Sequence, residues 1–87
     1  MFKFEFDQNK SLSNAQKHGI NFVEAQAIWL DPCLIEVQTR FNDEARSLVV
    51  GIIQGKHWSA ITTFRAPNIR IISVRRSRKS EVDLYES

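Results

Sequence analysis

The stretch from residue 33 to residue 76 has the pattern of one strand after another, and this run constrains the fold most. Residues 46–54 contain a near-continuous apolar run, which is typical of the central strand of a sheet. Turn-forming residues at 41–45, 55–56 and 66–68 predict the connections. Because these connections are short, they join antiparallel neighbours. The predicted strands span residues 33–39, 46–54, 58–64 and 69–76.

The segment before this run predicts a short strand and a helix. Phe2, Phe4 and Phe6 alternate with charged residues, which is the pattern of a strand with an aromatic face. Asp7 can then cap a helix over residues 8–18, because its carboxylate can accept hydrogen bonds from the first free N–H groups. Gly19 can end that helix, since glycine adopts the left-handed conformation of a C-cap without strain.

Two further helices are expected, one on each side of the β run. Asn21 and Glu24 have the spacing of a capping box and predict a helix that ends at Leu30, before Asp31-Pro32. Residues 77–85 predict a closing helix, with Ser77 or Ser80 as its cap. The whole order is β-α-α-β-β-β-β-α. We therefore expect an α+β fold, with helices packed on a mostly antiparallel sheet, in one domain over residues 1–87.

Charge is distributed unevenly along the chain. The net charge is +2, but residues 1–44 carry a balance of −3 and residues 45–87 carry a balance of +5. The hydrophobic content of 43% and the charged content of 25% are those of an ordinary globular protein, so the asymmetry is not a sign of disorder. A basic half predicts an anionic partner, which is RNA, DNA or an acidic protein.

Several classes of site are excluded by composition. Cys33 is the only cysteine, so we expect neither an internal disulfide nor a zinc site, and no metal or cofactor. No phosphate-binding glycine loop or GxSxG motif is present. No window approaches the length of a membrane span, and the first ten residues do not resemble a secretory leader. We expect a cytoplasmic protein.

The basic segment over residues 65–79 is the strongest functional signal. It contains six basic side chains and no acid. Guanidinium groups held on a strand suit phosphate binding, because each presents a planar fork of donors to the oxygens. Strict alternation would place Val74 beside Arg70 and Arg76 on one face, and Ile71 beside Arg75 on the other. The six residues are Arg65, Arg70, Arg75, Arg76, Arg78 and Lys79.

Two other features have both a structural and a functional interpretation. Lys17 and His18 precede Gly19, where basic residues stabilise a helix end, but they can also face the basic strand and assist proton transfer. Histidine is the residue type that titrates near neutral pH. Trp58 has the spacing of a half-buried core residue, and it can alternatively stack on a base of single-stranded RNA.

Taken together, the motifs resemble a known family. In chain order they are FEFDQNK, KHGINFVEA, LDP, NDEAR, TFR and RIISVRRS followed by EVDLYE. This order is similar to that of the BrnT toxins of type II toxin–antitoxin modules, over nearly the whole chain. The resemblance implies a fold like that of the RelE ribonuclease toxins and a metal-independent endoribonuclease that inhibits translation. It also implies an acidic BrnA-like antitoxin with a ribbon-helix-helix DNA-binding part, in a two-plus-two complex.

Metal-free RNA cleavage uses the 2′-hydroxyl of the RNA to attack the adjacent phosphodiester, and arginines stabilise the growing negative charge. We expect Arg65, Arg75 and Arg76 to surround the scissile phosphate, with Lys17 or His18 in proton transfer. The predicted RNA-binding residues are Arg70, Arg78, Lys79 and Trp58.

Two other classes of function remain open at this stage. The basic strand can belong to a nucleic-acid-binding module without catalysis, or to a protein-interaction domain with an acidic partner. An RNA cleavage assay in the presence of EDTA separates the three.

Overall fold

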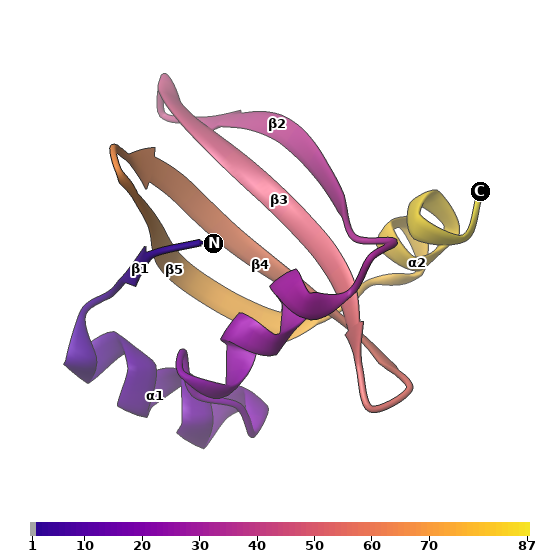
Figure 1. Ribbon diagram of the computed structural model, residues 1–87, viewed down its shortest axis with the longest axis horizontal. Coiled ribbons are helices and arrows are strands. Elements are labelled where there is room, and N and C mark those ends of the chain that lie inside the picture. The colour runs from indigo at the N-terminus through magenta and orange to yellow at the C-terminus, as the bar shows by residue number, and fades with distance from the viewer. Residues whose placement is uncertain (1) are drawn as a thin grey trace.

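The computed structural model describes residues 2–87, except for the side chain of Phe41. It confirms an α+β fold in which three helices pack on a five-stranded, mostly antiparallel sheet (Figure 1). The elements are β1 (Phe4–Glu5), α1 (Gln8–His18), η1 (Glu24–Leu30), β2 (Ile35–Phe41), β3 (Glu44–Ile53), β4 (Lys56–Arg65), β5 (Asn68–Arg76) and α2 (Lys79–Glu86).

The strand order across the sheet is β1-β5-β4-β3-β2. Three hairpins make β2 to β5 antiparallel, whereas β1 runs parallel to β5 and pairs with it through two residues only. In Figure 1, α1 lies below the sheet next to β5, η1 crosses in front of part of the sheet, and α2 lies at the right-hand end. The helices therefore leave uncovered the end of the sheet that carries the β2–β3 and β4–β5 turns (Figure 1).

The first hairpin turn is tighter than the sequence predicted, and the second lies one residue earlier. The first turn consists of Asn42 and Asp43, with φ of 51° and 64°, and the second of Gln54 and Gly55, with φ of 50° and 79°. Positive φ at both central residues matches the twist of paired strands. The strands are consequently longer than expected, because residues assigned to the turns pair with their neighbours.

The ends of α1 are confirmed in detail. The Asp7 carboxylate accepts hydrogen bonds from the backbone N–H groups of Asn9 and Lys10, at 2.8 and 3.1 Å. Gly19 adopts φ of 78°, and its N–H donates to the carbonyl of Ala15. Both ends were predictable because each depends only on neighbours in the sequence.

The other two helices differ from the prediction. The reciprocal bonds of Asn21 and Glu24 form, at 2.7 and 3.0 Å, but the segment that follows is a 3₁₀ helix. Neither Ser77 nor Ser80 caps α2. The Glu81 carboxylate instead accepts the backbone N–H of Arg78 at 2.9 Å, so α2 begins at Lys79.

The core lies between the sheet and the segment that runs from the end of α1 through η1. Its fully buried members include Phe22 and Ile28 on the helical side and Ala60 on the sheet. Ile28 packs against Gly51 so closely that a Cβ there would lie 2.9 Å from its Cγ2 atom. Gly51 therefore sets how near η1 can approach β3.

A β-bulge changes the predicted faces of β5. Ile71 pairs with Thr62 and Ser73 pairs with Ile61, so Ile72 is an extra residue without a partner. The bulge shifts the alternation by one residue. Ile71 and Val74 are therefore both buried in the core cluster, at 1% and 0% exposure, and the prediction that they face opposite sides is wrong.

Candidate nucleic-acid interface

The basic residues of the last hairpin lie at two ends of β5 and do not surround one point. Arg65 pairs with Asn68 at one end, and Arg75 pairs with Ser59 at the other. Arg65 and Ser59 are six residues apart on β4, which is about 20 Å at the rise of a strand. The structure therefore does not bring Arg65 together with Arg75 and Arg76 around a single phosphate.

The end of β5 that contains Arg70 forms an open, polar hollow. Lys10 of α1, Arg46 of β3 and Arg65 of β4 line it together with Arg70. Arg70 makes an ion pair with Glu5 at 2.8 Å, and Arg46 makes one with Glu44 at 2.6 Å. Glu44 and Glu5 occupy only part of the available donors.

Two observations indicate unused donor capacity in this hollow. Arg65 is exposed and makes no ion pair with any residue among 2–87. The Nε atom of Arg46 is buried and has no hydrogen-bond partner. Buried donors are nearly always paired in folded proteins, so the unpaired nitrogen shows that Glu44 does not satisfy the whole guanidinium of Arg46.

A second hollow adjoins the first and contains the end of α1. Lys17, His18 and Ser73 line it, and it shares Lys10 and Ile72 with the first hollow. The structure therefore brings Lys17 and His18 alongside the middle of β5. We call the two hollows together the cationic surface. Its basic members are Lys10, Lys17, His18, Arg46, Arg65 and Arg70.

The alignment of α1 on β5 depends on Asn14. Its side-chain amide donates to the carbonyl of Ile20 at 2.8 Å and its oxygen accepts the N–H of Val74 at 3.1 Å, and the residue is buried. The side chain of Asn14 thus accepts a backbone N–H of β5 that a neighbouring strand would otherwise bond, because β1 pairs only with Ile69 and Arg70. This contact holds Lys17 and His18 at the bulge.

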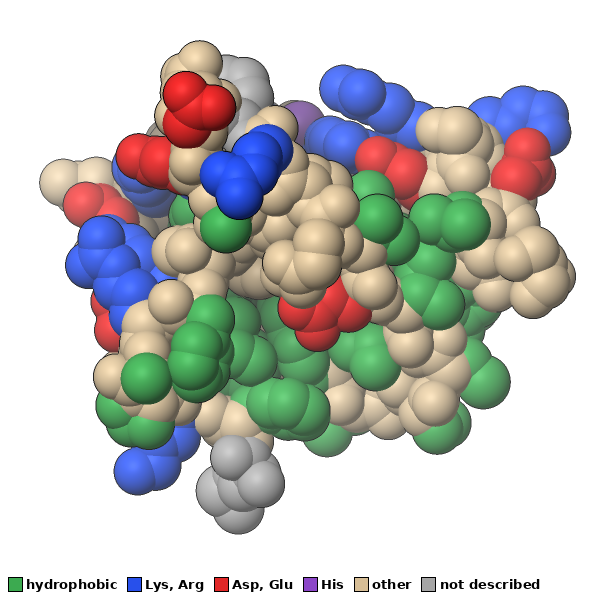
Figure 2. All heavy atoms as spheres, turned by 90° about the horizontal axis from the view of Figure 1, so that it is seen from above, with side chains coloured by type: hydrophobic (Ala, Val, Ile, Leu, Met, Phe, Trp, Pro, Cys, Tyr) green, Lys and Arg blue, Asp and Glu red, His purple; other side chains and the backbone are tan. Residues whose placement is uncertain are grey.

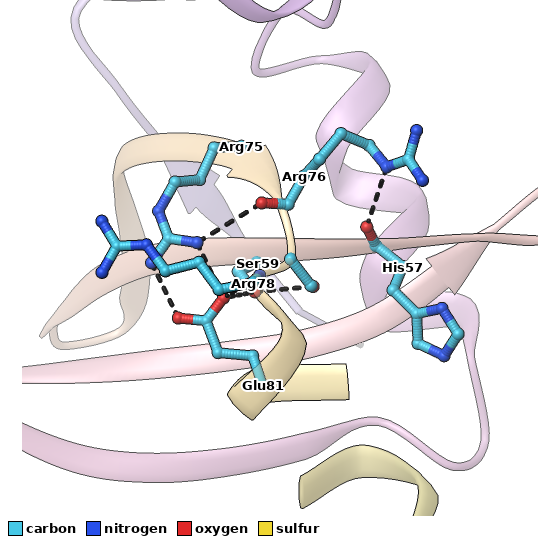
Figure 3. A network of polar contacts seen from close by, with 7 residues as sticks. His57, Ser59, Arg75, Arg76, Arg78 and Glu81 are labelled. Carbon is cyan, nitrogen blue, oxygen red and sulfur yellow. Dashed lines mark hydrogen bonds and ion pairs between the residues drawn. The ribbon is translucent and has the colours of Figure 1, made fainter. Parts of the chain in front are cut away.

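At the other end of β5, the guanidinium of Arg75 is already occupied. It donates two hydrogen bonds of 2.7 Å to the carboxylate of Glu81 on α2 (Figure 3). Glu81 also accepts bonds from Ser59 and from the backbone of Arg78. The hydrogen bonds from Arg75 lower the pKa of Glu81 to about 2, and Glu81 raises the pKa of Arg75. Arg75 therefore fastens α2 to the sheet.

Arg76 lies apart from Arg75, on the other face of the sheet (Figure 3). Its Nε donates to the carbonyl of His57 at 3.3 Å, and its guanidinium lies 5.5 Å from the centre of the Trp58 ring. Trp58 is partly buried and packs against the core. Its ring therefore serves as a support for Arg76, in agreement with the structural interpretation of this tryptophan.

The remaining predicted RNA-binding residues surround the start of α2. Arg78 and Lys79 are both exposed. Lys79 pairs with Asp83 at 3.0 Å, one turn further along the helix. An exposed pair of this kind contributes little to stability, so Lys79 can exchange Asp83 for another anion at low cost.

A second group of contacts holds α2 against the end of η1. The Tyr85 hydroxyl donates to Asp31 at 2.6 Å, which raises the pKa of Tyr85 to about 12 and lowers that of Asp31. His57 contacts Glu86 at 2.8 Å. Among the described residues, no three His, Cys, Asp or Glu side chains gather as metal ligands would.

Comparison with known proteins identifies the family. Residues 6–81 match the family model of the ribonuclease toxin BrnT of type II toxin–antitoxin systems. The chain belongs to this family. The match covers most of the chain, and the resemblance seen in the motifs is thereby confirmed. No curated protein matches the chain. Membership of the BrnT family implies a ribonuclease toxin that has an antitoxin partner.

No helix in the described part of the chain is long and apolar enough to cross a membrane.

Sequence reasoning missed Lys10 and Arg46 as members of the cationic surface of this BrnT chain. Lys10 lies on a separate helix and Arg46 on a separate strand, and neither is near the basic segment in the sequence. It also predicted no contact for Glu81, although Glu81 is the centre of the α2 network. The only available signal was the Arg78-to-Glu81 spacing, which matches an N-terminal helix turn.

Proposed function

We propose that this BrnT chain is an endoribonuclease that cleaves RNA by attack of the 2′-hydroxyl on the adjacent phosphodiester, without a metal ion. The observation that carries the proposal is the cationic surface, where three segments distant in the sequence supply basic side chains to two adjoining hollows. Basic residues that only interact with solvent would be spread along the basic segment. Here Asn14 holds α1 against β5, so that Lys10 and Lys17 on α1 join Arg46 and Arg70 around the adjoining hollows.

The proposed RNA path follows β5. Arg65 and Arg70 contact phosphates at one end of the strand. The RNA then passes round the other end of β5, about 20 Å away at the start of α2, where Arg78 and, on the opposite face, Arg76 contact its backbone. Lys79 adds a further contact there, and its pair with Asp83 is exposed and weak. An extended strand of RNA thus contacts both groups, whereas the sequence predicted that Arg65, Arg75 and Arg76 surround one phosphate.

In this arrangement the scissile phosphate lies between Arg65 and the end of α1. Arg65 stabilises charge on the non-bridging oxygens, and Lys17 or His18 assists proton transfer beside Ser73. Arg76 holds the flanking nucleotide, supported by Trp58. Arg75 contributes by positioning α2, because both terminal nitrogens of its guanidinium already bond to Glu81.

The proposed partner is an acidic BrnA-like antitoxin with a ribbon-helix-helix DNA-binding part, in a two-plus-two complex. The balance of +5 in residues 45–87 supports an acidic partner, because charge of opposite sign accelerates encounter. We also propose a single RelE-like domain that acts in the cytoplasm and inhibits translation.

Cleavage of a labelled RNA by the purified chain, with EDTA present, tests the proposal. We expect cleavage to persist after chelation. Arg65→Ala should lower the rate by about 10²- to 10³-fold, which is the usual loss when one donor to the developing charge is removed. Its melting temperature should stay unchanged, because Arg65 is exposed.

Arg40→Ala is the matched control, since Arg40 is an exposed arginine on β2 that lines neither hollow of the cationic surface. It should retain the parent rate. Equal loss in both variants would show that general charge, and not the cationic surface, determines activity. RNA binding without cleavage would assign the chain to a non-catalytic module.

A further inference from the structure

A second surface, which is apolar, remains after the cationic surface is assigned. It consists of two adjoining hollows that share Phe2 and Trp29, between η1 and the uncovered hairpin end of the sheet. We call it the apolar groove. Its large side chains are Phe2, Phe4, Val23, Trp29, Leu30 and Phe64.

Four of these side chains are far more exposed than those of the core, while Phe4 and Trp29 are partly buried. Leu30 is 83% exposed, Phe64 70%, Val23 64% and Phe2 56%. Isolated exposed apolar residues are common, but a contiguous group of this kind marks a site of interaction. In Figure 2, hydrophobic side chains gather in the lower half of the view, while most of the visible Lys and Arg side chains lie along its other borders.

The sheet register places most of this groove and most of the cationic surface on opposite faces, and Thr63 borders a hollow of each. Phe64 pairs with Ile69, and both belong to the face that carries the core, whereas Thr63 and Arg70 pair on the opposite face. A partner seated in the apolar groove therefore needs no contact with Arg65 or Arg70. The chain can bind one partner through apolar contacts and RNA through charge.

We propose that the apolar groove is the docking site of the antitoxin, which contributes a short segment with apolar anchor side chains. The proposal rests on the antitoxin partner of the family, and it deepens the proposed function by naming the surface that partner binds. Acidic character in the antitoxin accelerates encounter with the basic half of the chain, and the apolar anchors then supply most of the binding energy.

Charged side chains along the groove specify the segment further. Glu36 on β2 and Lys3 next to β1 line the hollow that contains Phe64, from opposite edges of the sheet, and Glu24 lines the other hollow. Glu36 is exposed and bonded to Ser47 and Gln38. A segment with a basic residue near Glu36 and an acidic residue near Lys3 is complementary to this arrangement. The groove therefore sets the direction in which the segment binds.

Affinity for the antitoxin encoded beside the toxin gene, measured by titration calorimetry with the full chain, tests this inference. Leu30→Asp and Phe64→Asp should each weaken binding by at least about 30-fold, as at a central contact of an interface. Glu36→Lys should weaken it about twofold to fivefold. Leu12→Asp is the matched control, because Leu12 is 56% exposed on α1 and lines neither hollow; it should bind like the parent.

Both groove variants alter exposed side chains, so melting temperatures should match the parent. Unchanged affinity in Leu30→Asp and Phe64→Asp would overturn the inference, as would a stronger complex in Glu36→Lys. Sedimentation of the chain alone provides a further check: a dimer that Leu30→Asp dissociates would assign the groove to a second copy instead. RNA cleavage by the free variants is measured separately, so an inactive parent would refute the proposed function without affecting this result.

Discussion

The two ends of β5 each carry an arginine paired with a glutamate, yet the pairs differ in what surrounds them. Arg70 and Glu5 have side chains that are 28% and 29% exposed, beside an open hollow. Arg75 and Glu81 are 24% and 10% exposed, and Glu81 also accepts hydrogen bonds from two further groups, the hydroxyl of Ser59 and the backbone N–H of Arg78. The first pair leaves donors available, and the second fixes a helix.

This difference shows that an arginine's neighbours in the sequence do not reveal whether its guanidinium is available. The value of an ion pair depends on burial and on additional hydrogen bonds. The side chain of Glu81 on helix α2 contacts one end of β5, while at the other end the edge of β5 that faces away from β4 pairs only with the two-residue strand β1. The same residue type therefore serves phosphate binding at one end and stability at the other.

Truncation of the two glutamates tests the comparison most strongly. Glu81→Ala should lower the free energy of unfolding by about 2–3 kcal/mol, because Arg75 and Ser59 lose their partner in a largely buried place. Glu5→Ala should lower the free energy of unfolding by much less, since Arg70 and Glu5 are each more than a quarter exposed beside an open hollow. Urea denaturation measures both. Similar losses would mean that burial does not distinguish the pairs.

Acid titration should reveal the same network. Because the pKa of Glu81 is about 2 in the folded protein and is ordinarily 4.5, the stabilisation is complete above pH 4.5 and is lost as the pH falls towards 2. We expect a loss on the order of 2 kcal/mol over this range, after allowance for solvent screening. Denaturation at a series of pH values, for the parent and for Glu81→Gln, isolates the contribution of this carboxyl. A parallel slope in both proteins would assign the acid sensitivity to other groups.

A smaller effect is expected from the hydroxyl that supports Glu81. Ser59 is 1% exposed and contacts both Glu81 and Ser77, at 2.9 and 2.7 Å. Ser59→Ala should cost about 1 kcal/mol, the net value of such a bond. Ser73→Ala is the control on β5, because Ser73 makes no side-chain hydrogen bond within residues 2–87 and should change stability by less than about 0.5 kcal/mol. If Ser73→Ala lowers the free energy of unfolding as much as Ser59→Ala does, the hydrogen bonds around Glu81 do not contribute more to stability than other positions on the sheet.

Much of the fold was predictable because its signals are local. The caps of α1 at Asp7 and Gly19 involve residues within a few positions of each other. The four strands from residue 33 onward follow from apolar runs and turns. The bulge at Ile72 was not predictable, because it is visible only in the pairing of β4 with β5.

The site was predicted less completely than the fold. Lys17 and His18 were expected to approach the basic strand, and the structure places them beside Ser73. Arg65 was expected beside Arg75, but the strand between them separates the two. Lys10 and Arg46 were not expected at all, because their positions depend on how α1 and β3 pack.

The sequence by itself determined that this chain is an α+β ribonuclease toxin of the BrnT family with a basic second half, since local patterns and motifs suffice for these conclusions. Only the tertiary structure decided which basic groups are available. Arg75 is occupied because Glu81, six residues away, returns to it across a turn and a helix start. Arg65 is available because no acid from the described residues reaches it. Availability depends on contacts between separate elements, and these form only when the sheet and its helices pack.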